Sequence, residues 1–103
     1  MNMTEKIKAF RGEYPALNAE PSVRLMDIGS ELGELNKEYL KATDYGARPF
    51  ALTKGFNEEY GDALYALLTL AEETGVDAEA ALDTVLEKYR RRLVEKGAMG
   101  SGN

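Results

Sequence analysis

Four acidic residues have the types and the spacing that could hold a divalent cation. They are Glu31 and Glu34 on one predicted helix and Glu59 and Asp62, again three residues apart, on the next. Residues three apart on a helix have β-carbons about 5–6 Å from each other, so each pair can chelate one ion or bridge two. On both helices the acids adjoin apolar positions rather than lying opposite them, which favours carboxylates that point into a partly buried space.

The composition restricts such a site to oxygen ligands. The 103-residue chain contains no histidine and no cysteine. Their absence excludes imidazole and thiolate ligands, disulfides, and Ser-His or Cys-His nucleophilic catalysis. Because carboxylate oxygens suit hard cations, we expect Mg²⁺, Mn²⁺ or Ca²⁺ rather than zinc or copper.

The alternative interpretation is an ordinary charged helix surface. Lys37 follows Glu34 at the i+3 spacing of solvent-exposed ion pairs, and Lys41 follows Glu38 in the same way. Like charges at this spacing cost about 0.2–0.5 kcal/mol per exposed pair, and two converging acidic rows repel each other unless a cation lies between them. Patterning alone leaves both interpretations open.

Charge and hydropathy limit the classes of partner. The chain has 18 acidic and 13 basic residues and a net charge of -5, which argues against duplex DNA or a membrane surface, since both need a basic face. The longest apolar stretch, 63–71, is too short to span a bilayer. Residues 1–10 lack the apolar run of a secretory signal. We therefore expect a cytoplasmic protein that binds neither nucleic acid polymers nor membranes.

Apolar residues at steps of three and four predict an all-α fold with four helices and no strand. The helices are expected at 4–12, 21–42, 56–74 and 78–93, with Thr4 and Asp77 as N-caps, Pro21 in a first turn and Gly75 as a C-cap. A chain of this length is expected to form one domain, over residues 1–96, followed by a disordered tail at 97–103. Residues 43–53 are expected to form a loop.

The segment 56–74 is apolar around most of its circumference, through Ala63, Leu64, Leu67, Leu68, Leu70 and Ala71. A helix of this kind must be buried on nearly all sides, and three other helices of so short a chain can hardly cover it. We therefore expect a homodimer or a dimer of dimers, in which a partner subunit completes a four-helix bundle. The alternative is the central helix of a monomeric bundle.

With these helices in place, the acidic residues match a family pattern. Glu31-Leu-Gly-Glu34 and, after residues 35–58, Glu59-Tyr-Gly-Asp62 resemble the E-x-x-E…E-x-x-D signature of the MazG-like all-α nucleoside triphosphate pyrophosphohydrolases. The flanking runs are similar to the two metal helices, the turn and the final helix of that family; they are 30–35, 58–71, 74–77 and 86–92. The resemblance covers most of the chain, from residue 20 to residue 95.

The resemblance implies a dimeric or tetrameric enzyme that hydrolyses NTPs or dNTPs to the monophosphate and pyrophosphate. Water would attack the α-phosphorus with the help of Mg²⁺ or Mn²⁺, in a house-cleaning role for the nucleotide pool. The implied metal ligands are Glu31, Glu34, Glu59 and Asp62. Glu38 is a candidate for an additional ligand or a general base, and the alternative is a solvated partner of Lys41.

Further substrate contacts are expected on the last helix. Lys88 and Arg92 match a basic pair that meets phosphate in similar short members, whereas Arg90 and Arg91 are expected to face solvent. Guanidinium groups bind phosphate bidentately, which suits this role. The alternative is that the helix macrodipole alone favours cations in these last turns.

The aromatic residues have two possible roles. In the loop 43–53, Tyr45, Arg48 and Phe50 could contact the nucleoside by stacking or hydrogen bonding. We prefer the interpretation that Tyr45 and Phe50 pin the loop to the helices. Tyr65 and Tyr89 are expected in the core or an interface.

Three other functions stay open. Phosphoribosyl-ATP pyrophosphohydrolase and the all-α dUTPase type share the chemistry and differ in substrate. A non-catalytic helical oligomerisation module would use its acids only as a surface. Such a module should show neither stabilisation by Mg²⁺ nor release of pyrophosphate.

Overall fold

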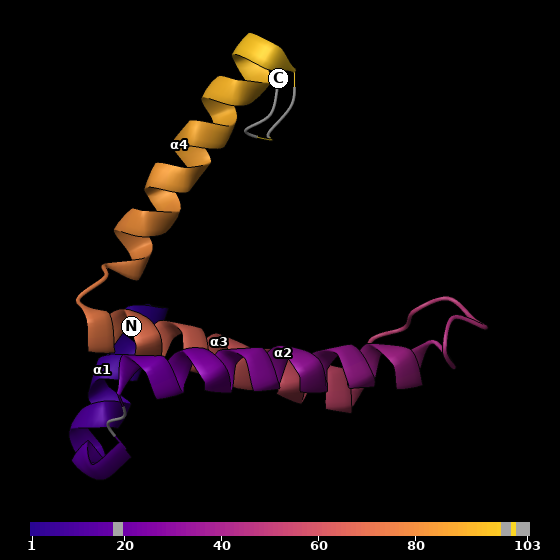
Figure 1. Ribbon diagram of the computed structural model, residues 1–103, viewed down its shortest axis with the longest axis horizontal. Helices are drawn as coiled ribbons and strands as arrows, with labels where there is room; N and C mark the ends of the chain where they lie inside the picture. Colours follow the sequence, from indigo (N-terminus) through magenta and orange to yellow (C-terminus); the bar gives the residue numbers. More distant parts are fainter. Residues whose placement is uncertain (18–19, 98–99, 101–103) are drawn as a thin grey trace.

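The computed structural model describes residues 1–17, 20–97 and 100. All regular structure within these residues is helical, in the order α1 (Met3–Glu13), a 3-10 turn η1 (Pro15–Leu17), α2 (Pro21–Ala42), α3 (Lys54–Thr74) and α4 (Ala78–Lys96). Figure 1 shows this arrangement. The prediction of an all-α fold with four helices and no strand is confirmed for the described part of the chain.

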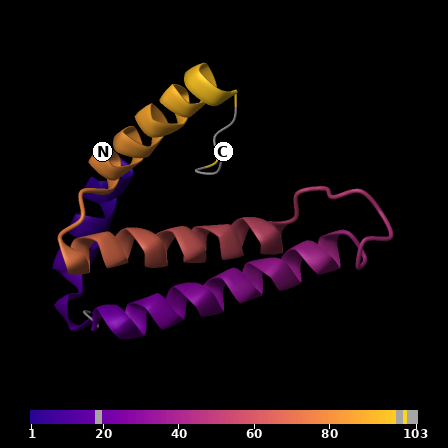
Figure 2. The ribbon, with the colours of Figure 1, turned by 45° about the horizontal axis from the view of Figure 1, so that its top comes forward.

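The centre of the fold is a hairpin of two long helices. α2 and α3 run side by side in opposite directions, joined by the loop at residues 43–53 (Figures 1 and 2). The shorter α1 packs on α3, where the rings of Phe10 and Tyr65 meet edge to face with centroids 5.9 Å apart. Ile7 of α1 is buried in the same contact region. Tyr65 is therefore a packing residue, as predicted.

Local capping explains most of the helix boundaries. α2 begins at Pro21, in the first turn where a missing N–H costs nothing. The side chain of Thr53 accepts a hydrogen bond from the backbone N–H of Phe56, so α3 starts at Lys54 rather than at Phe56. Gly75 ends α3 with a φ of 80°, the left-handed conformation that glycine adopts without strain. Its predicted role as a C-cap is confirmed.

The prediction of Thr4 as the first N-cap is wrong. Asn2 caps α1, because its side chain accepts from the N–H of Glu5 while the Glu5 carboxylate accepts from the N–H of Asn2. This reciprocal box places Thr4 inside the first turn.

At the other end of the chain, Asp77 caps α4 as predicted, by accepting from the backbone N–H of Ala80. The helix continues past Leu93 to Lys96 and ends at Gly97, which has a φ of 73°. Gly97, the first residue of the tail predicted to be disordered, is thus a helix cap, and the prediction is wrong for this residue. Residues 98–99 and 101–103 lie outside the described residues.

An aromatic cluster holds one end of the hairpin. Phe50, from the loop, stacks on Tyr39 of α2 with centroids 5.1 Å apart and planes 9° apart. It also meets Phe56 of α3 at 5.0 Å. The prediction that Phe50 pins the loop is confirmed. The same prediction is wrong for Tyr45, which has a φ of 55° in a left-handed turn and is 76% exposed.

A buried ion pair holds the other end. Arg24 of α2 donates from Nε to Oε1 of Glu73 on α3 over 3.0 Å, and from Nη2 to the carbonyl oxygen of Leu17 over 3.4 Å. Arg11 of α1 brings Nη2 to 3.9 Å from the same carboxylate. The Glu73 hydrogen bond raises the pKa of Arg24 above its ordinary value. These contacts tie α1, η1, α2 and α3 together.

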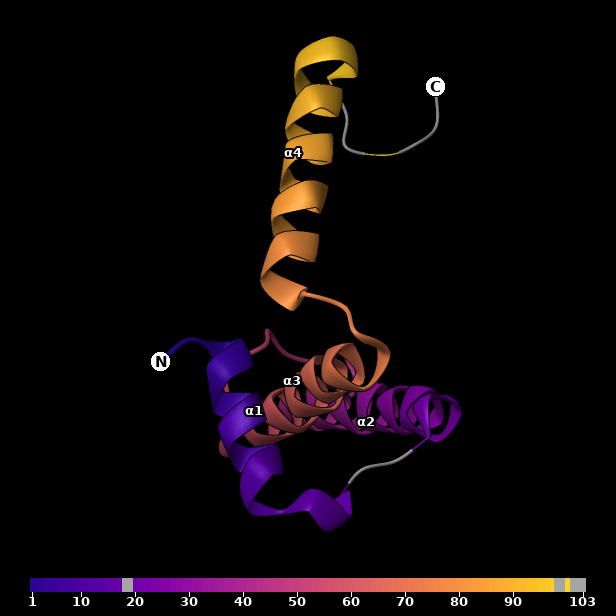
Figure 3. The same cartoon turned by 90° about the vertical axis from the view of Figure 1, so that its left-hand side faces the viewer.

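The last helix leaves the hairpin. α4 projects from the end of α3, and its second half lies away from α2 and α3 in every view (Figures 1, 2 and 3). Its apolar residues Leu82, Leu86 and Leu93 are each about half exposed. Judged on length together with hydropathy, no helix among the described residues meets the requirement for crossing a membrane.

Candidate metal centre

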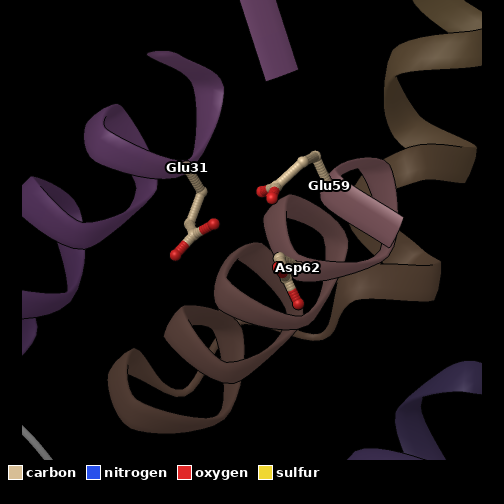
Figure 4. A group of neighbouring side chains, drawn as sticks. All are labelled: Glu31, Glu59 and Asp62. Atoms are coloured by element: carbon tan, nitrogen blue, oxygen red, sulfur yellow. The ribbon is translucent and has the colours of Figure 1, made fainter. Parts of the chain in front are cut away.

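Three of the predicted acids meet across the hairpin. Glu31 of α2 and Glu59 and Asp62 of α3 each offer one carboxylate oxygen, and these oxygens all lie within 4.8 Å of one another. Figure 4 shows Glu31 reaching toward α3 and Glu59 reaching toward α2. We call these three residues the carboxylate cluster. Oxygen atoms this close can share one cation.

The cluster lies at the edge of the helix contact rather than on an open surface. Glu31 and Glu59 are half-buried and Asp62 is exposed. Ala66, one turn beyond Asp62 on α3, is only 1% exposed. The acids of α3 thus adjoin a buried apolar position, but the expectation of a partly buried carboxylate holds for Glu59 and not for Asp62.

The charged forms of the cluster are disfavoured in the protein alone. Partial burial raises the pKa of Glu31, and the negative charges of Asp62, Asp27 and Glu34 raise it further. The pKa of Glu59 is raised by partial burial and then by Asp62 and Glu31. Both carboxylates therefore gain from a positive charge placed between them.

That positive charge does not come from a neighbouring side chain within the described residues. The ion pairs formed there involve none of the three cluster residues. Even the nearby Asp27 has a partner, because its Oδ2 lies 3.3 Å from Nη1 of Arg24. The cluster thus combines hard oxygen donors with an uncompensated negative charge, a donor set that fits Mg²⁺ or Mn²⁺.

Glu34, the fourth predicted ligand, is placed differently. Its side chain is 51% exposed, and Oε1 lies 3.8 Å from Nζ of Lys37. One turn of helix separates it from Glu31, so it stands beside the cluster while its carboxylate faces solvent. The structure thus brings together three of the four predicted ligands.

Glu38 is a residue of α2 whose side chain contacts the start of α3, and its negative charge is among those that raise the pKa of Glu59. Its Oε1 accepts a hydrogen bond from Nζ of Lys41 over 3.0 Å, and this contact raises the pKa of Lys41. Its Oε2 lies close against the backbone of Gly55. A β-carbon added at Gly55 would come within 2.5 Å of this oxygen. Sequence reasoning missed Gly55, and a glycine in the first turn of a helix is the signal that could have found it.

A hollow of about 430 Å³ opens beside this contact. It is lined by Glu38, Lys41, Arg48 and Gly55, together with loop residues between 49 and 53. Arg48 is bound to the hairpin, since its Nε donates to the carbonyl oxygen of Ala42 over 3.4 Å.

The predicted phosphate-binding residues are not part of this region in the single chain. Lys88 and Arg92 are half-buried along α4, whereas Arg90 and Arg91 are exposed as predicted. Nζ of Lys88 lies 5.4 Å from the ring centroid of Tyr89. Because the second half of α4 stands away from the hairpin (Figure 3), the chain does not place these cations at its own cluster.

One comparison identifies a relative. Over 90 residues the chain is 30% identical to the uncharacterized protein YpjD of Bacillus subtilis (strain 168), and the match covers 84% of this chain and 79% of that protein. This chain belongs to the YpjD family. No protein-family model and no solved structure matches it. The name of that relative states no activity.

Proposed function

We propose that this YpjD-family chain is a metal-dependent nucleoside triphosphate pyrophosphohydrolase of the MazG-like type. It would convert an NTP or dNTP and water to the monophosphate and pyrophosphate, and so remove unwanted nucleotides from the cytoplasmic pool. One observation carries the proposal: three carboxylates from two helices converge within 4.8 Å. The sequence around them supports it through its resemblance to the E-x-x-E…E-x-x-D signature.

The carboxylate cluster would hold Mg²⁺ or Mn²⁺. When bound, the ion supplies positive charge that neutralises phosphate oxygens and makes a water molecule more acidic. Glu31 lies on α2 and Glu59 on α3, so the packing of the two helices already brings these half-buried side chains toward each other before an ion binds. Asp62 and Glu34 are exposed to the solvent from which the substrate would enter.

Glu38 and the basic pair on α4 are proposed to assist the hydrolysis. Glu38 remains a candidate general base or additional ligand, although its contacts with Lys41 and Gly55 favour an anchored carboxylate over a mobile one. Lys88 and Arg92 are proposed to bind the substrate phosphates. Because α4 stands away from the hairpin of α2 and α3, these two cations would have to meet a substrate held by the carboxylate cluster of another molecule.

The experiment is a substrate panel. Canonical and damaged NTPs and dNTPs, together with dUTP and phosphoribosyl-ATP, are incubated with the protein and Mg²⁺ or Mn²⁺, and the products are separated by chromatography. We expect a monophosphate and pyrophosphate from at least one substrate. Glu59→Gln should lower the rate at least about 100-fold, since even residues that only orient metal ligands cost 10–100-fold.

The matched control is Glu58→Gln. Glu58 is the neighbouring acid, but it faces solvent and lies 3.8 Å from Lys54, so its removal should leave the rate within about twofold. Turnover confined to dUTP or phosphoribosyl-ATP would assign one of the two similar enzymes. Orthophosphate as the only product would move the attack away from the α-phosphorus. No turnover, together with no effect of Mg²⁺ on stability, would favour the non-catalytic module.

A further inference from the structure

Glu31 lies midway between two contacts that hold α2 against α3. Arg24 precedes it by seven residues and Glu38 follows it by seven. Seven residues make nearly two full helical turns, so the three side chains lie along one face of α2. Arg24 reaches Glu73 at the end of α3, and Glu38 reaches Gly55 in its first turn. The carboxylate cluster therefore lies between these two contacts.

The contact of Glu38 with Gly55 depends on the missing side chain of the glycine. A β-carbon at Gly55 would lie 2.5 Å from Oε2 and 2.9 Å from Cδ of Glu38, closer than a real β-carbon approaches another atom. Gly55 lies inside α3 and has no positive φ, so the backbone does not require a glycine there. At Gly29 of α2, in contrast, a β-carbon would meet nothing within 4 Å beyond its own helix backbone. Gly55 thus leaves the space that the Glu38 carboxylate fills.

The Glu38 carboxylate is held at this place from two sides. Nζ of Lys41 donates to its Oε1 over 3.0 Å, while its Oε2 lies against Gly55. The Glu38 side chain is 21% exposed, compared with 51% for Glu34 one turn earlier. The first turn of a helix carries partial positive charge on its unpaired N–H groups, which favours a carboxylate there. Glu38 thus supplies negative charge to the start of α3 from the neighbouring helix.

This contact lies one helical turn from the carboxylate cluster. Gly55 precedes Glu59 by four residues, which is about 6 Å along the axis of α3. The distance between α2 and the first turn of α3 therefore also sets how closely Glu59 approaches Glu31. Mg²⁺ binds oxygen at about 2.0–2.1 Å in near-octahedral geometry, so a small shift of one helix weakens its binding.

We propose that Glu38 and Gly55 are positioning residues of the metal centre. The Glu38 carboxylate, seated against Gly55, holds the first turn of α3 at the distance from α2 at which the three cluster carboxylates converge. This role rests on the proposed function, because the ion is taken to bind at the carboxylate cluster. It differs from the role of a ligand or a general base, since Glu38 acts through its contact with α3 and touches neither the ion nor the substrate.

Binding of Mn²⁺ alone tests this role without any turnover. Free Mn²⁺ is measured by electron paramagnetic resonance in titrations of the full chain. Gly55→Ala should weaken binding at least about tenfold, as the loss of groups that orient metal ligands does. The matched control is Gly29→Ala, the same substitution in the other helix of the hairpin. It should stay within about twofold of the wild type, because there is room for the new methyl group.

Two substitutions of Glu38 separate positioning from ligation. Glu38→Ala removes the contact and should weaken Mn²⁺ binding at least about tenfold. Glu38→Gln keeps the length of the side chain and an oxygen for Lys41, so it should lose less than about fivefold, the effect of one partly exposed charge. A loss for Glu38→Gln as large as that for Glu31→Gln would make Glu38 a ligand and overturn the proposal. This comparison decides the question even where Gly55→Ala fails to fold.

Melting temperatures in the presence of a chelator test the contact itself. Gly55→Ala should lower the melting temperature of the wild type, because the new methyl group displaces the Glu38 carboxylate. In a Glu38→Ala background the same change should leave it unchanged or raise it, since alanine favours a helix more than glycine does. Gly29→Ala should shift both backgrounds equally. Equal shifts for Gly55→Ala in the two backgrounds would show that Glu38 and Gly55 do not act together, and would overturn the proposal.

The outcomes for Mn²⁺ separate the positioning role from the proposed function. No binding of Mn²⁺ by the wild-type chain overturns both. Binding that neither Gly55→Ala nor Glu38→Ala weakens beyond the loss of Glu38→Gln overturns the positioning role alone.

Discussion

Arg24 and Glu73 form an ion pair that joins the start of α2 to the end of α3 and is largely covered by the protein. Nε of Arg24 lies 3.0 Å from Oε1 of Glu73, and the two side chains are 11% and 4% exposed. Arg90 and Glu87 on α4 are closer, at 2.7 Å, but their side chains are 68% and 58% exposed. Comparing the two pairs separates the effect of burial on the free energy of unfolding from the effect of the distance between the charges.

Arg24→Ala should lower the free energy of unfolding by about 3–5 kcal/mol, because it leaves the Glu73 carboxylate buried with less compensation. Arg90→Ala should cost less than about 1 kcal/mol, since an exposed pair is screened by water. Urea unfolding at one fixed protein concentration measures both. Equal losses for the two variants would contradict the assignment of the Arg24–Glu73 pair as buried.

Mg²⁺ should stabilise the wild-type protein through the carboxylate cluster. At a concentration 100 times the dissociation constant, binding to the folded state adds about 2.7 kcal/mol. Glu31→Gln should remove most of this gain, because it deletes one of the three converging carboxylates. Glu58→Gln should keep it, since Glu58 faces solvent and its Oε1 lies 3.8 Å from Nζ of Lys54. Thermal unfolding with and without Mg²⁺ distinguishes the two, and an equal loss in both variants would contradict binding at the carboxylate cluster.

The metal-free protein should lose stability as the carboxylate cluster ionises. The pKa of Glu59 is raised above its ordinary value of 4.5, so the folded state binds this proton more tightly than the unfolded state does. The resulting contribution to stability is full below pH 4.5 and is lost as the pH rises through the folded pKa.

Glu59→Gln should remove that contribution. The variant should therefore gain stability relative to the wild type as the pH rises above 4.5, in the presence of a chelator. Denaturant titrations between pH 4 and pH 8 follow the difference, with Glu58→Gln as the control. A difference that shrinks with rising pH would show that the Glu59 carboxylate is stabilised rather than strained.

Phe50 should anchor the loop at residues 43–53. Phe50→Ala removes its stacking on Tyr39 and its contact with Phe56. We expect a loss of about 1–3 kcal/mol, below the cost at a fully buried site, because Phe50 is 37% exposed. Tyr45→Asn should stay within about 0.5 kcal/mol, since asparagine tolerates the left-handed backbone there. Hydrogen exchange of the loop amides should rise in the first variant alone.

The sequence by itself determined the helices and limited the side chains that could hold a metal. Pro21, Gly75 and Asp77 marked helix ends correctly, because capping depends on residues within a few positions of one another. Of the boundaries that were wrong, those at Thr4 and Phe56 follow from neighbouring caps at Asn2 and Thr53, and the last helix runs on from Leu93 to its cap at Gly97. The absence of histidine and cysteine already restricted any metal site to oxygen ligands.

Tertiary structure alone decided which acids meet. Glu31 and Glu34 have the same spacing as Glu59 and Asp62, yet Glu34 faces solvent while the other three converge. The spacing along one helix is fixed by its repeat, but the distance between two helices depends on their rotation and register. Contacts distant in the sequence set both of these, at the Arg24–Glu73 pair and at the aromatic cluster of Phe50.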